Sequence, residues 1–359
     1  MKIKDVRTIM LDLPGTHWII RPEIRSFGCV LVFVDTDEGI TGESVLWTFG
    51  TRGLNVLNSM VLSLKEDMVG EDPHDTERIW QKLWTDLGFF GVEGISVFGL
   101  SAMDRACWDL VGKAAGKPLY KLLGACRNEV PTYASSFWLQ QSIDELVKDA
   151  RAFVRDGYRA LKMRVGKPRM EEDVERVQAV REAIGPEVNL MVDANQRFTV
   201  DHAIRLGRRL EELNLTWFEE PVPAYDLDGS ARVAAALDLP IASGENIYTR
   251  YGFRRMLEKQ AADILMPDLI RVGGVTEFLK VAHMAGAYDV PITPHLFPEE
   301  SMHLVGAISN STYVENISWL SPLYTEGIEL RNGLIVLPER PGFGLTFDPE
   351  VIERYRLRE

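Results

Sequence analysis

The chain has 359 residues, which allows roughly two domains at about 150 residues per domain. Its 40 Lys and Arg residues and 53 Asp and Glu residues give a net charge of −13, and 46% of the residues are hydrophobic. A chain of this length can bury a large core without disulfides. The negative charge disfavours nucleic acid and anionic membrane surfaces as partners.

The N-terminus shows no apolar segment followed by a small-residue cleavage site, so we expect no signal peptide. No stretch approaches 18 apolar residues, and we therefore expect no membrane span. The three cysteines, Cys29, Cys107 and Cys126, are odd in number and widely spaced, which is typical of a reducing compartment. We predict a cytoplasmic protein.

The first 125 residues predict an α+β unit. Alternating runs at 2–13 and 30–35, with turn residues between 37 and 42, indicate antiparallel strands. Helical sequence follows, notably 101–115, and Gly116-Lys-Pro118 marks its end.

From residue 126 to 325, short β-rich runs alternate with amphipathic helical stretches such as 142–159, 170–184 and 201–213. The β-rich runs start about 26 residues apart and span 132–137, 160–165, 189–195, 216–221, 241–246, 264–269, 292–297 and 314–319. Eight βα units are what a closed (β/α)8 barrel of the TIM type requires. A doubly wound open sheet is the alternative, and the even spacing favours the barrel.

The tail, 326–359, returns to strand-like sequence at 329–336 and 341–344. We expect it to rejoin the N-terminal unit. The predicted organisation is an N-terminal capping domain (1–125), a catalytic α/β barrel (126–325) and a C-terminal segment that returns to the cap (326–359).

The C-terminal ends of barrel strands converge on one mouth. Every predicted strand from the second to the eighth ends in ionisable residues, which core strands otherwise avoid because unpaired buried charge is costly. These residues are Lys162, Arg164, Asp193, Glu219, Glu220, Glu245, Asp268, His295 and Glu315.

Three of these carboxylates, Asp193, Glu219 and Glu245, follow one another at intervals of 26 residues, so neighbouring strands present them side by side. Oxygen-only ligands select a hard cation such as Mg²⁺. The alternative is that the acids pair with Lys or Arg, or cap the following helices. Their equal spacing, with Lys162 and Arg164 upstream, favours a metal site.

His295 ends the predicted seventh strand, and Asp268 ends the sixth. A carboxylate beside an imidazole can fix its tautomer and raise its basicity. We therefore expect His295 to serve as a general acid/base. The other five histidines fit packed or solvated positions.

The ordered motifs of this region resemble the enolase superfamily, and within it most closely the mandelate racemase subgroup (the mandelate racemase/muconate lactonizing enzyme family). The motifs are Lys162-x-Arg164, Val192-Asp-Ala-Asn195, Trp217-Phe-Glu-Glu-Pro221, Gly244-Glu-Asn246, Met266-Pro-Asp268 with Gly273-Gly274, and His295 followed by Glu315. The resemblance covers nearly the whole chain and implies an enolase-like modified barrel with an α+β cap.

The resemblance also implies an Mg²⁺-dependent enzyme that abstracts the proton α to a carboxylate and stabilises the resulting enediolate. Asp193, Glu219 and Glu245 would bind the metal, and no other cofactor is implied. Lys162 would neutralise the carboxylate of a small-molecule substrate, and Asn195 would contact that substrate. Glu315, kept protonated, would donate a hydrogen bond to the oxyanion.

By the same resemblance, loops of the capping domain would close the mouth, at 16–25 and 47–54, with Trp18, Arg21 and Arg25 as candidate contacts. The family commonly forms homo-oligomers, and we expect one here.

One position departs from the family pattern, which is usually Lys-x-Lys with the second Lys as a base. Here it is Arg164, whose pKa exceeds about 12, so it is a poor base. Racemisation needs acid/base groups on both faces of the substrate, whereas dehydration needs one, because His295 could remove the α-proton and then protonate the leaving hydroxyl.

The catalytic set is thus Lys162, Arg164, Asp268, His295 and Glu315. We predict first an acid-sugar dehydratase that forms a 2-keto-3-deoxy acid. The second hypothesis is a racemase or epimerase of a 2-hydroxy acid or amino acid derivative, with a desolvated Arg164 or Lys162 as the second base. A non-catalytic metal-binding barrel is a remote alternative. A nucleotide enzyme is disfavoured because 273–274 and 341–344 are only fragments of a glycine loop.

Overall fold

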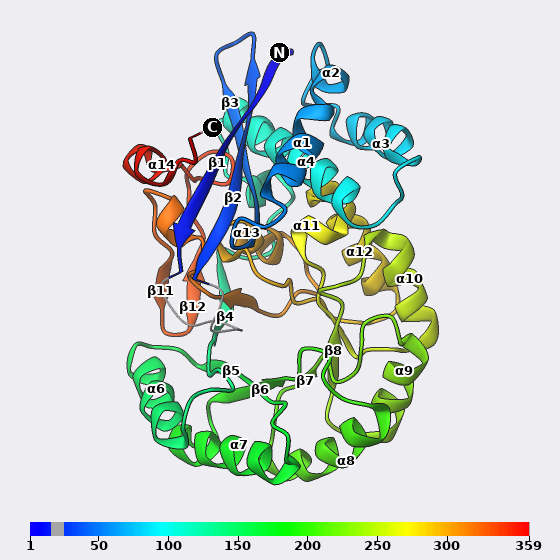
Figure 1. Cartoon of the computed structure of the whole chain (residues 1–359), viewed down its shortest axis with the longest axis vertical. Helices are drawn as coiled ribbons and strands as arrows, with labels where there is room; N and C mark the ends of the chain where they lie inside the picture. Colours follow the sequence, from blue (N-terminus) through cyan, green and yellow to red (C-terminus); the bar gives the residue numbers. More distant parts are fainter. Residues whose placement is uncertain (16–24, 359) are drawn as a thin grey trace.

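A computed structural model describes residues 1–15 and 25–358 (Figure 1). It begins with a three-stranded antiparallel sheet in the order β1 (Ile3–Pro14), β2 (Ser26–Thr36), β3 (Thr41–Phe49). Five helices follow: α1 (Leu54–Ser63), α2 (Lys65–Met68), α3 (Thr76–Leu87), α4 (Ile95–Ala115) and α5 (Leu119–Leu122). Helix α4 packs closely on β3 at Gly42. Any larger residue would clash there, since a Cβ at Gly42 would lie 2.2 Å from the Ala106 carbonyl oxygen.

The parallel strands of the second part run in sequence order around a barrel. They are β4 (Glu129–Ser135), β5 (Ala160–Arg164), β6 (Asn189–Asp193), β7 (Phe218–Glu219), β8 (Ile241–Ser243), β9 (Ile264–Leu265) and β10 (Val314–Asn316). Strand β10 pairs in parallel with β4, so the last strand lies beside the first. The expected barrel is confirmed.

Helices cover the outside of this barrel, as Figure 1 shows for α6 to α10. They are α6 (Ile143–Arg155), α7 (Met170–Ile184), α8 (Val200–Leu210), α9 (Leu227–Ala236), α10 (Thr249–Lys259), α11 (Leu269–Val272), α12 (Val275–Ala287) and α13 (Pro298–Ala307). Helix α7 has the predicted bounds, whereas α6 begins after a Ser142 capping box and ends four residues early. The predicted helix 201–213 is α8 followed by the 3-10 turn η1 (Glu211–Leu213).

The prediction of a regular seventh strand at 292–297 is wrong, because this segment forms only isolated β-bridges. Isolated bridges join Ile292 to Leu265 and Ser311, and His295 to Asp268, and these bridges continue the barrel between β9 and β10. Proline at positions 291, 294 and 298 removes backbone donors, which a central strand needs. Leu296 and Phe297 then take left-handed backbone angles, φ 55° and 50°.

After β10 the chain leaves the barrel. The turn η2 (Ser321–Leu323) leads to a hairpin of β11 (Glu329–Arg331) and β12 (Leu334–Val336), and β12 pairs antiparallel with β4. In the described part of the chain, the eighth strand is therefore followed by a hairpin and not by a barrel helix. This is the modified form of the barrel that the resemblance implies.

The end of the chain lies against the N-terminal sheet. Arg356, just after α14 (Pro349–Tyr355), forms a bridge with Leu11 of β1, and Gly342 forms one with Pro118. The two termini lie near the same end of the molecule in Figure 1. The exact division at residues 125 and 325 stays a prediction.

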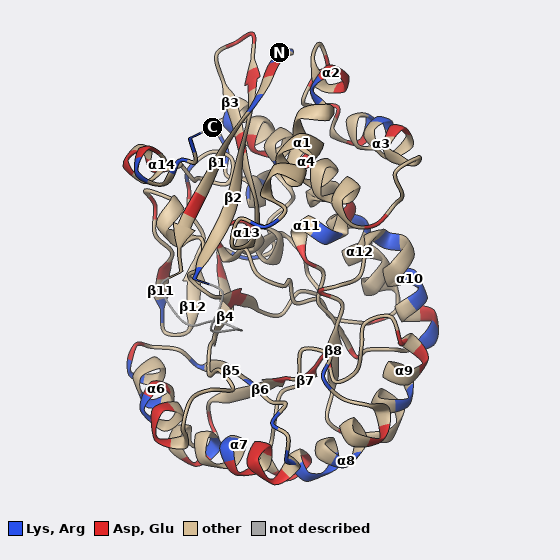
Figure 2. Ribbon diagram, viewed as in Figure 1, with Lys and Arg blue, Asp and Glu red and all other residues tan. Residues whose placement is uncertain are grey.

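The N-terminal part and one side of the barrel share a hydrophobic core. Its buried residues include Leu31 of β2 and Met103 of α4 together with Leu269, Phe278 and Leu296. Charged residues are instead frequent along helices around the barrel such as α7, α8 and α10, as the ribbon colours of Figure 2 show. None of the helices in the described ranges has the length and apolarity that a bilayer span needs.

Candidate active site

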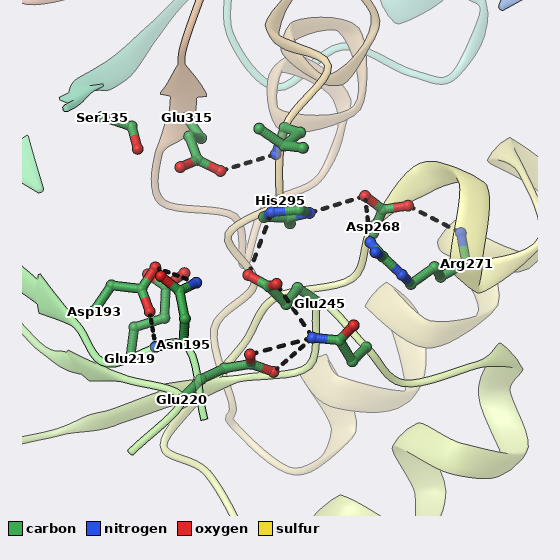
Figure 3. Close-up of polar contacts among 12 residues, drawn as sticks. Ser135, Asp193, Asn195, Glu219, Glu220, Glu245, Asp268, Arg271, His295 and Glu315 are labelled. Atoms are coloured by element: carbon green, nitrogen blue, oxygen red, sulfur yellow. Dashed lines mark hydrogen bonds and ion pairs between the residues drawn. The ribbon is translucent and has the colours of Figure 1, made fainter. Parts of the chain in front are cut away.

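Three carboxylates gather at the C-terminal ends of neighbouring strands. Asp193 ends β6 and pairs in register with Glu219 of β7, and Glu245 follows β8 (Figure 3). One oxygen atom from each of Asp193, Glu219 and Glu245 lies within 4.8 Å of the others. The spacing of 26 residues therefore brings these side chains together, and the oxygen donors suit a hard divalent cation.

Two buried cations border the carboxylate cluster. The Lys162 Nζ lies 2.7 Å from Glu219 Oε1 and 2.9 Å from Glu315 Oε1. The Arg164 Nη1 lies 2.6 Å from Asp193 Oδ2. Two of the three acids, Glu219 and Asp193, thus form ion pairs with Lys162 and Arg164, as the alternative to a metal site predicted.

Negative charge nevertheless remains in excess. Besides the three cluster acids, buried Glu220 and Glu315 lie in the same region, against the charges of Lys162 and Arg164. Burial, followed by the nearby Asp193, raises the pKa of Glu219 to about 8. A bound dication would offset this crowding, so the residues present fit the predicted metal.

His295 and Asp268 form a hydrogen-bonded pair. The His295 Nδ1 lies 2.8 Å from Asp268 Oδ2, and its Nε2 lies 3.3 Å from Glu245 Oε2. A neutral imidazole that donates its Nδ1–H to Asp268 directs an unprotonated Nε2 toward the carboxylate cluster. Burial lowers the pKa of His295, but Glu245, Asp268 and Glu315 outweigh it and raise the pKa to about 9. The metal-free site therefore favours the imidazolium at neutral pH, and the neutral form would follow when a dication takes up the charge of Glu245.

Asp268 is itself held in place as the N-cap of α11. Its Oδ1 accepts hydrogen bonds from the backbone N–H groups of Ile270 and Arg271, each at 2.9 Å. The Arg271 Nη1 lies 3.3 Å from Asp268 Oδ2. Burial raises the pKa of Asp268, but Arg271 and His295 reverse this and leave the pKa below its usual value. Asp268 is therefore ionised, and it can accept a hydrogen bond from the Nδ1–H of His295.

Glu315 bridges the two sides of the mouth. Its Oε2 accepts a hydrogen bond from the Leu296 N–H at 3.0 Å, while Oε1 faces Lys162. Burial raises the pKa of Glu315, but Lys162, His295 and Arg164 overcome that effect and hold the pKa well below its usual range. The structure therefore favours the carboxylate form and not the protonated acid that the family resemblance implies.

Arg164 is fixed on several sides. Its Nη2 lies 3.4 Å from the Ser135 hydroxyl, and its guanidinium lies 5.2 Å from the centre of the Trp138 ring. Burial lowers the pKa of Arg164, but Asp193, Glu315 and Glu219 raise it above the usual value. Arg164 therefore stays protonated, and its fixed guanidinium orients Asp193.

Asn195 also supports Asp193. Its backbone N–H donates to Asp193 Oδ1 at 2.7 Å, and its Nδ2 donates to Oδ2 at 3.2 Å. Asn195 has φ 43°, a left-handed conformation that Asn tolerates better than most residues. In this structure it is a support for a cluster acid, and contact with substrate stays a prediction.

Sequence reasoning named Glu220 and Asn246 but missed their contact, and it missed Ser135 and Trp138 altogether. The Asn246 Nδ2 lies 3.3 Å and 3.2 Å from the two Glu220 oxygens and 3.2 Å from Glu245 Oε1. The second Glu of Trp217-Phe-Glu-Glu-Pro221 was a signal for this contact. Ser135 and Trp138 gave none, because the first strand ends without an ionisable residue.

The predicted loops of the cap are only partly described. Trp18 and Arg21 lie outside the described residues, and Arg25 is exposed. Trp47 lies 5.6 Å from Trp319 between ring centres, and Trp319 stacks on Trp138 at 6.2 Å. An aromatic cluster thus links the 47–54 segment to the side of the mouth that holds Arg164.

The chain is similar to known proteins along most of its length. Residues 19–124 match the family model for the mandelate racemase/muconate lactonizing enzyme N-terminal domain, and residues 145–351 match the enolase C-terminal domain-like model. The chain is 40% identical over 288 residues to the L-talarate/galactarate dehydratase of Salmonella typhimurium, covering 80% of this chain and 72% of that one.

Two further similarities cover nearly the full length. The chain is 36% identical to the 3,6-anhydro-alpha-L-galactonate cycloisomerase of Streptomyces coelicolor, over 98% of this chain and 99% of that one. It also resembles the crystal structure of L-talarate dehydratase from Polaromonas sp. JS666 complexed with Mg and L-glucarate. That match has a TM-score of 0.93 and 36% identity, and covers 99% of this chain and 98% of that chain.

Proposed function

The chain belongs to the mandelate racemase/muconate lactonizing enzyme family of the enolase superfamily, and we propose that it is an Mg²⁺-dependent acid-sugar dehydratase. The observation that carries the proposal is the asymmetry of the mouth. His295, paired with Asp268, directs one ring nitrogen toward the carboxylate cluster, whereas the opposite side holds two cations engaged by carboxylates. The names of the similar dehydratases support the same reaction.

Asp193, Glu219 and Glu245 would hold the metal. Bound there, Mg²⁺ would supply a Lewis acid that withdraws charge from the substrate carboxylate. Asn195 and Arg164 orient Asp193, Asn246 orients Glu245, and Lys162 holds Glu219, through the contacts described above. Their role is to keep the ligand oxygens together before substrate arrives.

His295 would perform both proton transfers. Its Nε2 takes the proton from the α-carbon, and the electron pair of that C–H bond moves toward the carboxylate. The resulting imidazolium, stabilised by Asp268, then gives this proton to the β-hydroxyl, which leaves as water. The enol that remains takes a proton from solvent at C3 and becomes the 2-keto-3-deoxy acid.

Lys162 would stabilise the charge that develops on the substrate carboxylate, and Glu315, as a carboxylate, would hold the Lys162 ammonium in place. Lys162 is fully buried and lies between Glu219 and Glu315, so its ammonium is fixed at the inner end of the cluster. Burial lowers the pKa of Lys162, but these two acids and Asp193 raise it above the usual value. A lysine that retains its proton is an electrostatic partner and not a base, which disfavours racemisation.

A screen of aldonates and aldarates tests the proposed reaction. The purified protein with Mg²⁺ should convert at least one acid to a product that gives the colour reaction of 2-keto-3-deoxy acids, and chelation should stop it. His295→Asn should slow conversion by about 10²–10⁴-fold. Inversion at the α-carbon with no keto product would support the racemase or epimerase hypothesis and contradict dehydration.

We further propose a cytoplasmic homo-oligomer. The three cysteines are all free, and two of them are buried, which suits a reducing compartment. The loop between α3 and α4 exposes 93% of Phe89 and 69% of Phe90, apolar surface of the kind that a second subunit covers. Light scattering of the purified protein gives the assembly state directly.

A further inference from the structure

We propose that Arg105, on helix α4 of the N-terminal part, is a positioning residue for the proposed acid/base His295. Helix α4 contributes no residue to the carboxylate cluster. It contacts, however, the chain segments on both sides of the His295–Asp268 pair. The inference rests on the proposed function only in taking His295 as the group that moves the proton.

One face of α4 reaches three barrel segments. The Ser101 hydroxyl donates to the Leu269 carbonyl of α11 at 2.8 Å, directly after Asp268. Asp104 accepts a hydrogen bond from the backbone N–H of Thr276 at the start of α12. Positions 101, 104 and 105 share one face because a helix repeats every 3.6 residues. This face therefore anchors the Asp268 segment directly.

Arg105 anchors the His295 segment. Its Nε and Nη2 bind the two oxygens of Glu300 at 2.7 and 2.6 Å, and Nη2 also donates to the Val45 carbonyl at 2.9 Å. The guanidinium carbon lies 5.0 Å from the centre of the Phe297 ring. Arg105 is fully buried, so this two-pronged pair is shielded from water.

The segment that Arg105 holds has an unusual backbone. Leu296 and Phe297, the two residues after His295, both have left-handed φ angles. Such conformations persist in residues other than glycine only where surrounding contacts enforce them. The contacts are the Leu296 N–H to Glu315, the Leu296 carbonyl to the Ser301 hydroxyl at 2.7 Å, and Arg105 on Phe297 and Glu300.

Loss of the two hydrogen bonds from Arg105 to Glu300 would let residues 296–300 relax toward ordinary backbone angles. His295 would then move relative to Asp268 and to the carboxylate cluster. The cluster acids lie on β6, β7 and the end of β8, and Arg105 contacts none of these elements in the described structure. Metal binding should therefore survive where proton transfer does not.

The test compares four proteins: wild type, Arg105→Met, Arg105→Lys and the control Lys113→Met. Lys113 lies two turns further along α4 and pairs with Asp109 at 2.7 Å, so its loss perturbs the same helix without touching the His295 segment. Each protein, labelled with ¹⁵N-histidine, is examined with Mg²⁺ alone. The proton on the His295 Nδ1 is assigned by its disappearance in His295→Asn.

In wild type and in Lys113→Met, we expect a downfield NMR signal from the His295 Nδ1 proton, which is hydrogen-bonded to Asp268. It should shift upfield or vanish in Arg105→Met, and Arg105→Lys should restore it in part. Mg²⁺ affinity by calorimetry should change less than about twofold in all variants. With a converted acid, kcat of Arg105→Met should fall about 10- to 100-fold while KM changes little, as for a misplaced catalytic group.

An unchanged His295 signal and unchanged kcat per folded molecule in Arg105→Met would overturn the inference. If Arg105→Met does not fold, Arg105→Met/Glu300→Leu removes both charges, and the same two readouts decide. Absence of turnover by wild type on every acid would refute the proposed function, whereas the histidine signal would still test Arg105.

Discussion

Arg164→Met should lower the free energy of unfolding far more in the metal-free protein than in the protein with bound Mg²⁺. The Arg164 guanidinium lies 2.6 Å from Asp193 Oδ2, and the side chains of both residues are at least nine-tenths buried. Removing one partner of a buried ion pair costs about 3–5 kcal/mol, because the other charge stays buried without compensation. We expect the free energy of unfolding without Mg²⁺ to fall by about 3 kcal/mol.

A bound dication would take over the neutralisation of Asp193. At saturating Mg²⁺ the deficit relative to wild type should therefore shrink to about 1 kcal/mol, the scale of a lost hydrogen bond. Conversion of the acid at saturating Mg²⁺ should stay within about tenfold of wild type, since one factor of ten corresponds to about 1.4 kcal/mol and Arg164 is not the base.

Urea unfolding with EDTA and with saturating Mg²⁺ measures both deficits. Arg250→Met is the matched control, because the Arg250 Nη1 pairs with buried Glu277 at 2.5 Å, away from the cluster. Its deficit should be equal in the two conditions. The reasoning is refuted if the Arg164→Met deficit is likewise independent of Mg²⁺, or if the metal-free variant is as stable as wild type.

Further predictions concern the cluster, the acid/base and a buried histidine. Asn246→Leu removes the amide between Glu220 and Glu245, and calorimetry should show Mg²⁺ binding weakened by about 10- to 100-fold; equal affinity would contradict a supporting role. His295→Asn should lower kcat by about 10²–10⁴-fold with Mg²⁺ affinity retained, and a variant that still dehydrates would exclude His295 as the acid/base. Buried His303 accepts a hydrogen bond from the Tyr120 N–H, and burial followed by Arg340 lowers its pKa to about 4. The unfolded chain, with an ordinary pKa near 6.5, binds this proton first, so stability is full above that pH and falls by about 3 kcal/mol as the pH drops to 4. His303→Gln should flatten this part of the curve in urea titrations, and an unchanged slope between pH 6.5 and 4 would show that His303 is not responsible.

The spacing of the strands was sufficient to predict the barrel and its cluster of acids. Asp193 and Glu219 are register partners on neighbouring parallel strands, and Glu245 lies three residues beyond Ala242, the register partner of Glu219, where the chain after β8 brings its carboxylate back to the other two. The pairing of His295 with Asp268 followed from the same rule, because these residues end neighbouring segments. Periodicity and position along a strand are local properties that a sequence displays.

Features that depend on three-dimensional packing were not predictable in this way. Residues 292–297 looked like a strand, yet Pro294, the prolines that flank this segment and two left-handed residues leave only isolated bridges. The charge state of Glu315 depends on Lys162, which reaches it from another strand. Arg105 lies 190 positions before His295, and no sequence pattern connects α4 with that segment.

The most direct test of the account is proton NMR of the reaction in D₂O with Mg²⁺ and the acid that the screen identifies. The account predicts a 2-keto-3-deoxy product with one deuterium at C3, while unreacted substrate keeps its α-configuration, because His295 serves one face and Lys162 and Arg164 stay charged on the other. Accumulation of the α-deuterated epimer without a keto product would contradict it, and would show that a group on the Lys162 and Arg164 side acts as a base.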